Sequence, residues 1–196
     1  VTNDTTPYLS HSLLDASNYQ TMVHDWNATD VEYPKEGTIV SLFEAQVEKA
    51  PEAIALVFEG SQLTYRELNE RANRLAHHLR DTYTLGPDDL VGLMLDRSLW
   101  SVISMLGVLK AGAGYVPIDT EYPEARKSFI IDDTGLKVLI IESQSLFDVI
   151  DYNASIFSID IEFDALPQDE VYTNNPGLSI SPTDLCYVIY TSGTTG

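Results

Sequence analysis

Short apolar runs of strand length alternate with helix-length segments along most of this chain, and this alternation restricts the fold more than any other feature. The clearest runs cover residues 90–95, 137–141 and 184–190. Strands that are apolar at nearly every position are typical of a sheet buried on both faces. Strands that alternate with helices of about 10–15 residues indicate βαβ units. The sequence therefore predicts an α/β fold with a mostly parallel sheet flanked by helices.

Local signals mark the start of the longest helix. Thr64 and Glu67 have the capping-box spacing, in which each side chain binds the backbone amide of the other residue. The helix after Thr64 has one apolar face that we expect to be buried, made of Leu68, Ala72, Leu75, Ala76 and Leu79. Four arginines lie elsewhere on the same helix and are predicted to face solvent: Arg66, Arg71, Arg74 and Arg80.

The remaining elements follow from the same periodicity. Further helices are predicted at 98–112, 123–133 and 143–150, together with a short helix that carries Leu42 and ends at Pro51. Further strands are predicted at 53–58, 115–118 and 155–159. Pro117 indicates a sheet edge or a strand end, because proline cannot donate to the ladder. Residues 160–181 are acidic and proline-containing, and are predicted to be irregular.

Residues 1–38 differ from the rest in composition and are predicted to form an interdomain linker. They are rich in Asn, Asp and Thr and contain only isolated apolar anchors. One amphipathic helix from Ser12 to Asp25 is expected, packed on a larger body; a docking peptide for another domain is the alternative. Residues 39–196 are predicted to form the α/β core.

Charge and cysteine content exclude several classes of protein. The 11 basic and 30 acidic residues give a net charge of −19, which disfavours binding to nucleic acid or anionic membranes. Cys186 is the single cysteine, so no internal disulfide framework or cysteine-clustered zinc site is possible. The adjacent His77 and His78 point apart on a helix, and no metal site is predicted. No apolar run approaches the ~20 residues of a membrane span, and a cytoplasmic location is expected.

The C-terminal run of hydroxyl and glycine residues is the candidate binding element. It follows the predicted strand 184–190 and consists of Thr191, Ser192, Gly193, Thr194, Thr195 and Gly196. Such a loop offers backbone amides and hydroxyls to a phosphate. The six residues alone fit an ordinary turn about as well as an anion-binding loop.

Three segments together resemble a known family. Residues 185–196 resemble the phosphate-loop signature of adenylate-forming enzymes, and 109–119 resemble the second core motif of nonribosomal peptide synthetase adenylation domains. Tyr122, Pro123 and Arg126 extend that second motif, and 63–68 resemble the first. The three motifs occur in the order found in the family. Residues 26–44 are similar to the segment that joins a condensation domain to an adenylation domain.

This resemblance implies a specific activity. Such domains bind ATP with Mg²⁺ and an amino acid, form an aminoacyl adenylate and pyrophosphate, and load the acyl group onto the phosphopantetheine thiol of a carrier domain. The resemblance assigns the β- and γ-phosphates of ATP to the loop 191–196. It implies an upstream condensation domain and a downstream carrier domain as partners. No catalytic role is carried onto Lys110 or Asp119, which we interpret as scaffold residues.

The resemblance also implies an N-terminal fragment of the adenylation domain, because the family's lysine-bearing loop continuation, amino-acid pocket and mobile subdomain lie downstream of such a loop. The 196 residues alone are therefore expected to be inactive. Two alternatives stay open: an acyl-CoA synthetase-type enzyme, which would share the phosphate loop, and a non-catalytic half-domain that acts only as a scaffold. The identity of the amino acid cannot be read from these residues.

Overall fold

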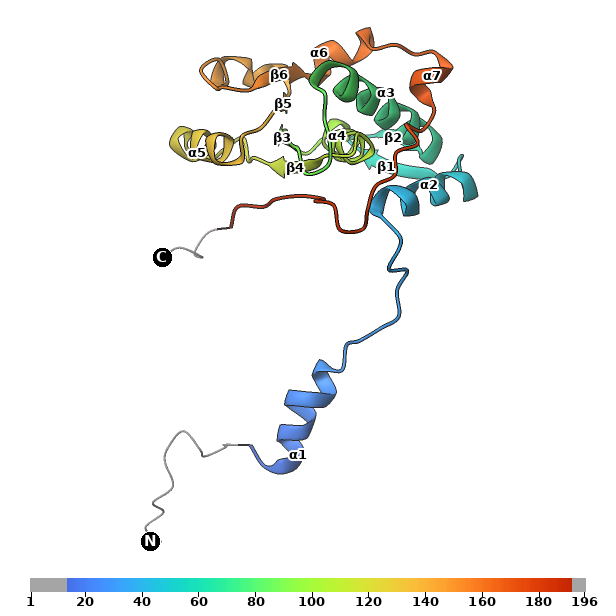
Figure 1. The fold of residues 1–196 in the computed structure, drawn as a ribbon, viewed down its shortest axis with the longest axis vertical. Helices are drawn as coiled ribbons and strands as arrows, with labels where there is room; N and C mark the ends of the chain where they lie inside the picture. Colours follow the sequence, from blue (N-terminus) through green and yellow to red (C-terminus); the bar gives the residue numbers. More distant parts are fainter. Residues whose placement is uncertain (1–13, 192–196) are drawn as a thin grey trace. The chain divides into compact units, whose positions relative to one another are not determined.

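The computed structural model describes residues 14–191 and separates the chain into two compact units, residues 1–35 and 36–196 (Figure 1). In the first unit, helical turns run continuously through α1 (Ala16–Tyr19), η2 (Gln20–His24) and η3 (Asp25–Asn27). The Asp15 carboxylate caps this helix by accepting from the Asn18 amide over 2.8 Å. A helix was predicted here, and the described part of it ends two residues later than expected. Its packing on a larger body stays a prediction.

A four-stranded parallel sheet forms the centre of the second unit, as the apolar runs predict. The strand order is β4 (Gly114–Pro117), β3 (Leu90–Met94), β5 (Val138–Ile141) and β6 (Ser155–Ser158), and each neighbouring pair is parallel. Pro117 is the last residue of β4, where the missing N–H costs no ladder bond. The sheet confirms the predicted fold class.

Helices cover both faces of this sheet. The chain passes from β3 through α4 (Leu99–Lys110) to β4, and then through α5 (Glu124–Thr134) back across β3 to β5. Crossovers of one hand that run in opposite directions place their helices on opposite faces. Accordingly, Val138 and Ile140 of β5 belong to one apolar cluster with α4, whereas Leu139 and Ile141 belong to a second cluster with α5.

The predicted strand at 53–58 exists but lies outside the parallel sheet. β1 (Ile54–Phe58) pairs with β2 (Ser61–Thr64) in a separate antiparallel hairpin. The two turn residues, Glu59 and Gly60, both have positive φ, 47° and 82°. This is the backbone that a tight two-residue hairpin turn requires. β2 was not predicted, because its run, Ser-Gln-Leu-Thr, has little apolar content.

The capping box at the start of α3 (Tyr65–Tyr83) is confirmed. The Thr64 amide donates to Glu67 Oε2 over 2.8 Å, and the Glu67 amide donates to Thr64 Oγ1 over 3.2 Å. The predicted apolar face of α3 is buried, whereas the prediction of a solvent-facing Arg74 was wrong. Arg74 is 9% exposed and donates to the carbonyls of Phe163, Leu166 and Pro167.

The C-terminal third is more ordered than predicted. The stretch after β6 contains α6 (Ile159–Glu162), η5 (Phe163–Ala165) and α7 (Glu170–Thr173), where only irregular chain was expected. The helix predicted at 143–150 is the 3₁₀ helix η4 (Ser143–Asp148). η5 and the two residues after it supply the carbonyls that bind Arg74, which explains why a charged residue can be buried there.

The remaining helix, α2 (Ile39–Lys49), ends before Pro51 as predicted, although Leu42 on its expected inner face is 54% exposed. Phe43, on the same predicted face, does pack against the core. Within the described residues 14–191, no helix is long and apolar enough to cross a membrane.

Candidate functional site

A cleft lies at the carboxyl ends of β3 and β4. The connections that leave these two neighbouring strands run to opposite faces of the sheet, α4 to one and α5 to the other. In open α/β sheets this reversal opens a crevice outside the carboxyl ends of the strands, which is where ligands bind. The cleft has a volume of ≈ 620 Å³ and is lined by residues 95–97 after β3, by Pro117 at the end of β4 and 118–122 after it, and by Ile189 and Tyr190. Its size suits a small-molecule ligand.

The polar wall of the cleft is an ordered network. Asp96 accepts a hydrogen bond from Thr120 Oγ1 over 2.6 Å and another from Gln144 Nε2 over 2.9 Å. Asp119 accepts from the amide of Glu121 over 2.9 Å, which fixes the turn after β4. Arg97 lines the same cleft and is exposed. The wall thus presents hydroxyl, guanidinium and carboxylate groups from two strand ends.

The predicted buried strand 184–190 lies beside β4 as an irregular edge segment, which corrects the expectation of full burial. It forms a single parallel bridge, between Tyr115 and Tyr187. The Tyr115 amide donates to the Cys186 carbonyl over 3.1 Å, and the Val188 amide donates to the Tyr115 carbonyl over 3.0 Å. Alternate residues are therefore exposed: Leu185 45%, Tyr187 51% and Ile189 57%. One neighbouring strand is not enough to bury both faces.

The parallel direction of the edge segment brings its carboxyl end to the cleft. Ile189 and Tyr190 line the cleft, and Thr191, the first residue of the candidate loop, follows them and is exposed. The other five residues predicted to bind phosphate, Ser192 to Gly196, lie outside the described residues. The start of the candidate loop therefore directly follows two residues that line the cleft.

Residues that we interpreted as scaffold have structural partners. The side chain of Lys110 is fully buried, ion-paired with Glu44 and bonded to Asn175 Oδ1 over 3.1 Å. Burial lowers the pKa of Lys110, and the Glu44 carboxylate opposes that shift. Val116 and Ile118 fill the sheet as expected, at 0% and 2% exposure. The second core motif thus supports the edge of the sheet, with its Asp119 in a turn.

Cysteine and histidine add no reactive centre in the described residues. Cys186 is half-buried, and desolvation raises the pKa of its thiol, which keeps it protonated. His77 bonds the Asn174 carbonyl over 3.1 Å, and His78 packs against Phe157 with ring centroids 4.8 Å apart. Within residues 14–191 no group of three or more His, Cys, Asp or Glu residues could hold a metal ion.

The local sequence pattern does not predict the cleft residues Asp96, Arg97 and Thr120. Each follows the carboxyl end of a strand that it did predict, β3 or β4. Their position after adjacent parallel strands is a usable signal, but it needs the strand order. That order depends on contacts across the chain and cannot be read from local pattern.

Residues 43–196 match the sequence profile of the family described as AMP-binding enzyme. N-(5-amino-5-carboxypentanoyl)-L-cysteinyl-D-valine synthase of Amycolatopsis lactamdurans is 44% identical over 174 residues, which are 87% of this chain and 5% of that protein. Bacitracin synthase 3 of Bacillus licheniformis is 41% identical over 184 residues, 94% of this chain and 3% of that protein. The chain thus spans 5% or less of the length of these two relatives.

Solved structures show the same fold. The nonribosomal peptide synthetase FmoA3 in its AMPPNP-bound form aligns with a TM-score of 0.76 and 28% identity, over 95% of this chain and 20% of that one. The N-terminal subdomain of Klebsiella oxytoca NpsA, in complex with 3-hydroxybenzoyl-AMSN, aligns with a TM-score of 0.73 and 25% identity, over 85% of this chain and 41% of that one. These matches confirm the resemblance to nonribosomal peptide synthetase adenylation domains. With the profile match over 43–196, the chain belongs to the AMP-binding enzyme family.

Proposed function

We propose that this chain forms part of an adenylation domain that activates an amino acid with ATP and loads it onto the phosphopantetheine thiol of a carrier domain. In this reaction a carboxylate oxygen of the amino acid attacks the α-phosphorus, the α–β phosphoanhydride bond breaks, and pyrophosphate leaves. The thiol then displaces AMP from the aminoacyl adenylate. The family membership of the chain supports the nucleotide chemistry, and the likeness to peptide synthetases supports the amino-acid substrate.

One observation carries the proposal for this chain. The edge segment 184–190 runs parallel to β4, and its last two residues line the cleft, so that the hydroxyl-rich loop begins directly after them at Thr191. A loop at this position can present amides and hydroxyls to the terminal phosphates of a nucleotide seated in the cleft. We propose Thr191, Ser192, Gly193, Thr194, Thr195 and Gly196 as the phosphate-binding residues.

The charge of the cleft limits what these residues do alone. Three carboxylates, from Asp96, Asp119 and Glu121, line the cleft together with the guanidinium of Arg97. The Arg97 guanidinium and the Thr120 and Thr191 hydroxyls fit a phosphate, but the wall as a whole does not neutralise a triphosphate. We therefore propose that the 196 residues by themselves neither hold ATP tightly nor catalyse adenylation.

The proposed cofactors and partners follow from the family. Mg²⁺ would accompany ATP, and the described residues contain no metal-ligand cluster. A carrier domain bearing phosphopantetheine is the proposed downstream partner, in keeping with an adenylation–PCP fusion among the structural neighbours. Residues 1–38 are proposed as the linker from an upstream condensation domain, and 39–196 as the core portion.

Amino-acid-dependent exchange of pyrophosphate into ATP tests the proposal. The full-length product of the gene that contains this sequence is assayed with each proteinogenic amino acid. We expect exchange with one or a few amino acids, and a large loss in a variant that lacks 191–196. Thr191→Ala should raise the KM for ATP, whereas Thr29→Ala, outside the core, serves as a matched control.

Each outcome discriminates between functions. Exchange driven by fatty acids, with acyl transfer to free coenzyme A, would replace the proposal with an acyl-CoA synthetase. No exchange with any acid from the folded full-length protein would favour a non-catalytic scaffold. Exchange by the purified 196-residue chain, with its fold checked by circular dichroism, would overturn the proposed inactivity of this part alone.

A further inference from the structure

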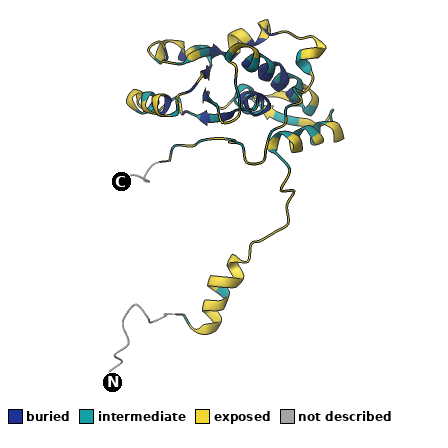
Figure 2. Ribbon diagram, in the orientation of Figure 1, coloured by how far each residue is buried: buried dark blue, intermediate teal, exposed yellow. Residues whose placement is uncertain are grey.

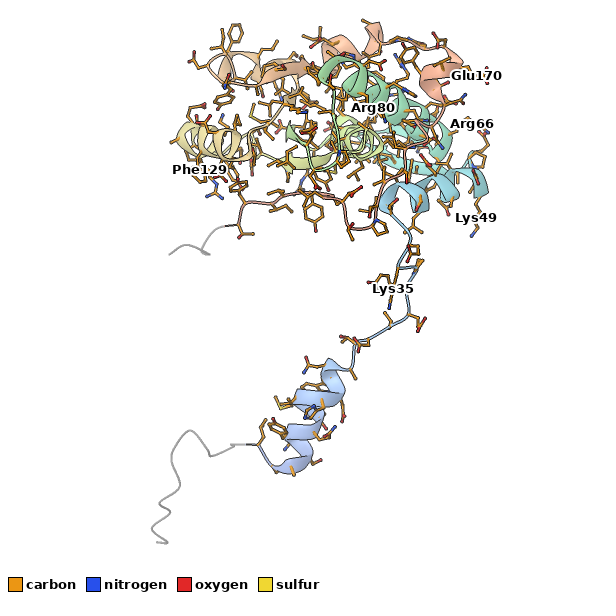
Figure 3. The ribbon with its side chains drawn as sticks, viewed as in Figure 1. Lys35, Lys49, Arg66, Arg80, Phe129 and Glu170 are labelled. Carbon is orange, nitrogen blue, oxygen red and sulfur yellow. The ribbon has the colours of Figure 1, made fainter. Side chains whose placement is uncertain are left out.

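One face of α5 holds the end of the edge segment, and the proposed function above does not use this contact. Arg126, Phe129 and Asp133 all contact a single residue, Tyr190. Their spacing of three and then four positions puts them on the same side of a helix. Figure 3 labels Phe129 on α5, next to the C-terminal segment that its ring contacts.

The three contacts hold three different parts of Tyr190. Arg126 Nη2 donates to the Tyr190 carbonyl over 3.5 Å. The Phe129 ring meets the Tyr190 ring edge-on, with centroids 6.1 Å apart. The Tyr190 hydroxyl donates to the Asp133 carboxylate. Burial first, and then Asp133, raises the pKa of this hydroxyl to about 12, so it keeps its proton at neutral pH. Backbone, ring and hydroxyl are thus each fixed by α5.

Arg126 has further hydrogen-bonding capacity at this point. Its guanidinium lies over the Tyr122 ring, 4.6 Å from the centroid, and Tyr122 itself lines the cleft. Arg126 Nε is buried and has no hydrogen-bond partner among the described residues. Arg126 also forms no salt bridge there, unlike Lys127 beside it, which pairs with Glu124. A buried donor of this kind calls for an acceptor that the described residues do not supply.

We propose that Arg126, Phe129 and Asp133 form a clamp on Tyr190, and that this clamp sets the position of the next residue, Thr191, beside the cleft. This inference rests on the proposed function, because it gives the clamp a role in ATP binding. The three are positioning residues, since they act through Tyr190. Through the clamp, Arg126, which continues the second core motif, contacts Tyr190 in the phosphate-loop segment 185–196. This contact gives Arg126 a role other than packing of the sheet.

The kinetic test separates positioning from simple stability. In the full-length protein, Arg126→Ala should raise the KM for ATP about tenfold, because the charged hydrogen bond from the Arg126 guanidinium to the Tyr190 carbonyl is lost. The KM for the amino acid should not change. Arg126→Lys, which keeps a charged donor, should recover part of the effect. Arg80→Ala on α3 is the matched control, since this arginine is on the opposite face of the sheet from α5 and makes no described side-chain contact with the edge segment.

A second measurement does not depend on activity. Amide hydrogen exchange of peptides covering 184–191 should speed up in Arg126→Ala, with the β3 and β5 peptides unchanged. Tyr190→Phe, which removes only the hydroxyl that binds Asp133, should produce a smaller increase. Both changes should be absent in Arg80→Ala.

The outcomes distinguish failure of the clamp from failure of the proposed function. An unchanged KM for ATP, even with a lower Tm, would show a structural role only and overturn the inference. Unchanged amide hydrogen exchange in the 184–191 peptides of Arg126→Ala would overturn the clamp whether or not the protein is active. If the wild-type protein activates no carboxylic acid with ATP, while amide hydrogen exchange at 184–191 still depends on Arg126, the clamp stands and the proposed function is wrong.

Discussion

The central strands β3 and β5 and the edge segment 184–190 have similar apolar sequences but different surroundings. β5 is buried at all four positions and β3 at four of its five, whereas every second residue of the edge segment is exposed (Figure 2). Each central strand has a strand on both sides and helices on both faces, while the edge segment has only β4. An apolar run therefore becomes a buried strand only where tertiary neighbours cover both of its faces.

The largest expected effect comes from truncating one isoleucine in each of the two regions. Ile140→Ala in β5 should destabilise the protein by about 3 kcal/mol, because it opens a cavity in a fully packed core. Ile189→Ala should stay within about 0.5 kcal/mol, since that side chain is 57% exposed. Urea unfolding midpoints measure both. Equal losses would show that the edge segment is covered in solution and would remove the contrast.

A smaller effect is expected from the ion pair that ties α2 to α4. Glu44→Ala leaves the fully buried Lys110 ammonium without its carboxylate and should cost about 2 kcal/mol, less than for a completely buried pair because Glu44 is partly exposed. Glu52→Ala removes the exposed partner of Arg66 and should be close to neutral.

The pH dependence of the Glu44→Ala variant gives a further check. Burial lowers the pKa of Lys110 below the 10.5 of an unperturbed lysine, so the folded state binds fewer protons than the unfolded state. The variant should therefore regain stability as pH rises toward that value. An equal loss of stability at all alkaline pH values would contradict a charged, buried Lys110.

The smallest expected effect is the contribution of His78 to the pH dependence of the free energy of unfolding. Desolvation lowers the pKa of His78 below 6.5, with Glu162 and Asp81 opposing the shift. The neutral ring is thus favoured in the folded state, and stability should fall as pH drops below about 6.5. His78→Gln should lose this part of the slope between about pH 7.5 and pH 5.5, measured by urea unfolding. The same slope in the variant would assign the effect to other groups.

Local patterns predicted the elements better than their partners. The capping box at Thr64, the apolar face of α3 and the strands at 90–95 and 137–141 depend on residues within one turn or one run. The antiparallel pairing of β1 is with the neighbouring run β2, whose low apolar content gives no strand signal. The burial of Arg74 depends on distant chain. Arg74 bonds carbonyls 89 to 93 residues away, which no local window contains.

The candidate site divides in the same way. The hydroxyl-rich loop after 190 is visible in the sequence, because residue types and order carry its chemistry. The cleft at Asp96 and Thr120, and the contact of Arg126 with Tyr190 64 residues later, require the strand order and the side of the sheet on which α5 lies. Those features follow from how the crossovers turn.

The amino-acid sequence by itself determined the α/β class, most helices and strands, the position of the loop, and the resemblance to adenylation domains. Those properties depend on short-range periodicity, capping and motif spacing. The tertiary structure decided which strands lie at the centre, which charges are buried, where the cleft opens and what holds Tyr190. These depend on contacts between residues far apart in the chain, where burial is set by neighbours rather than by the apolar character of a segment.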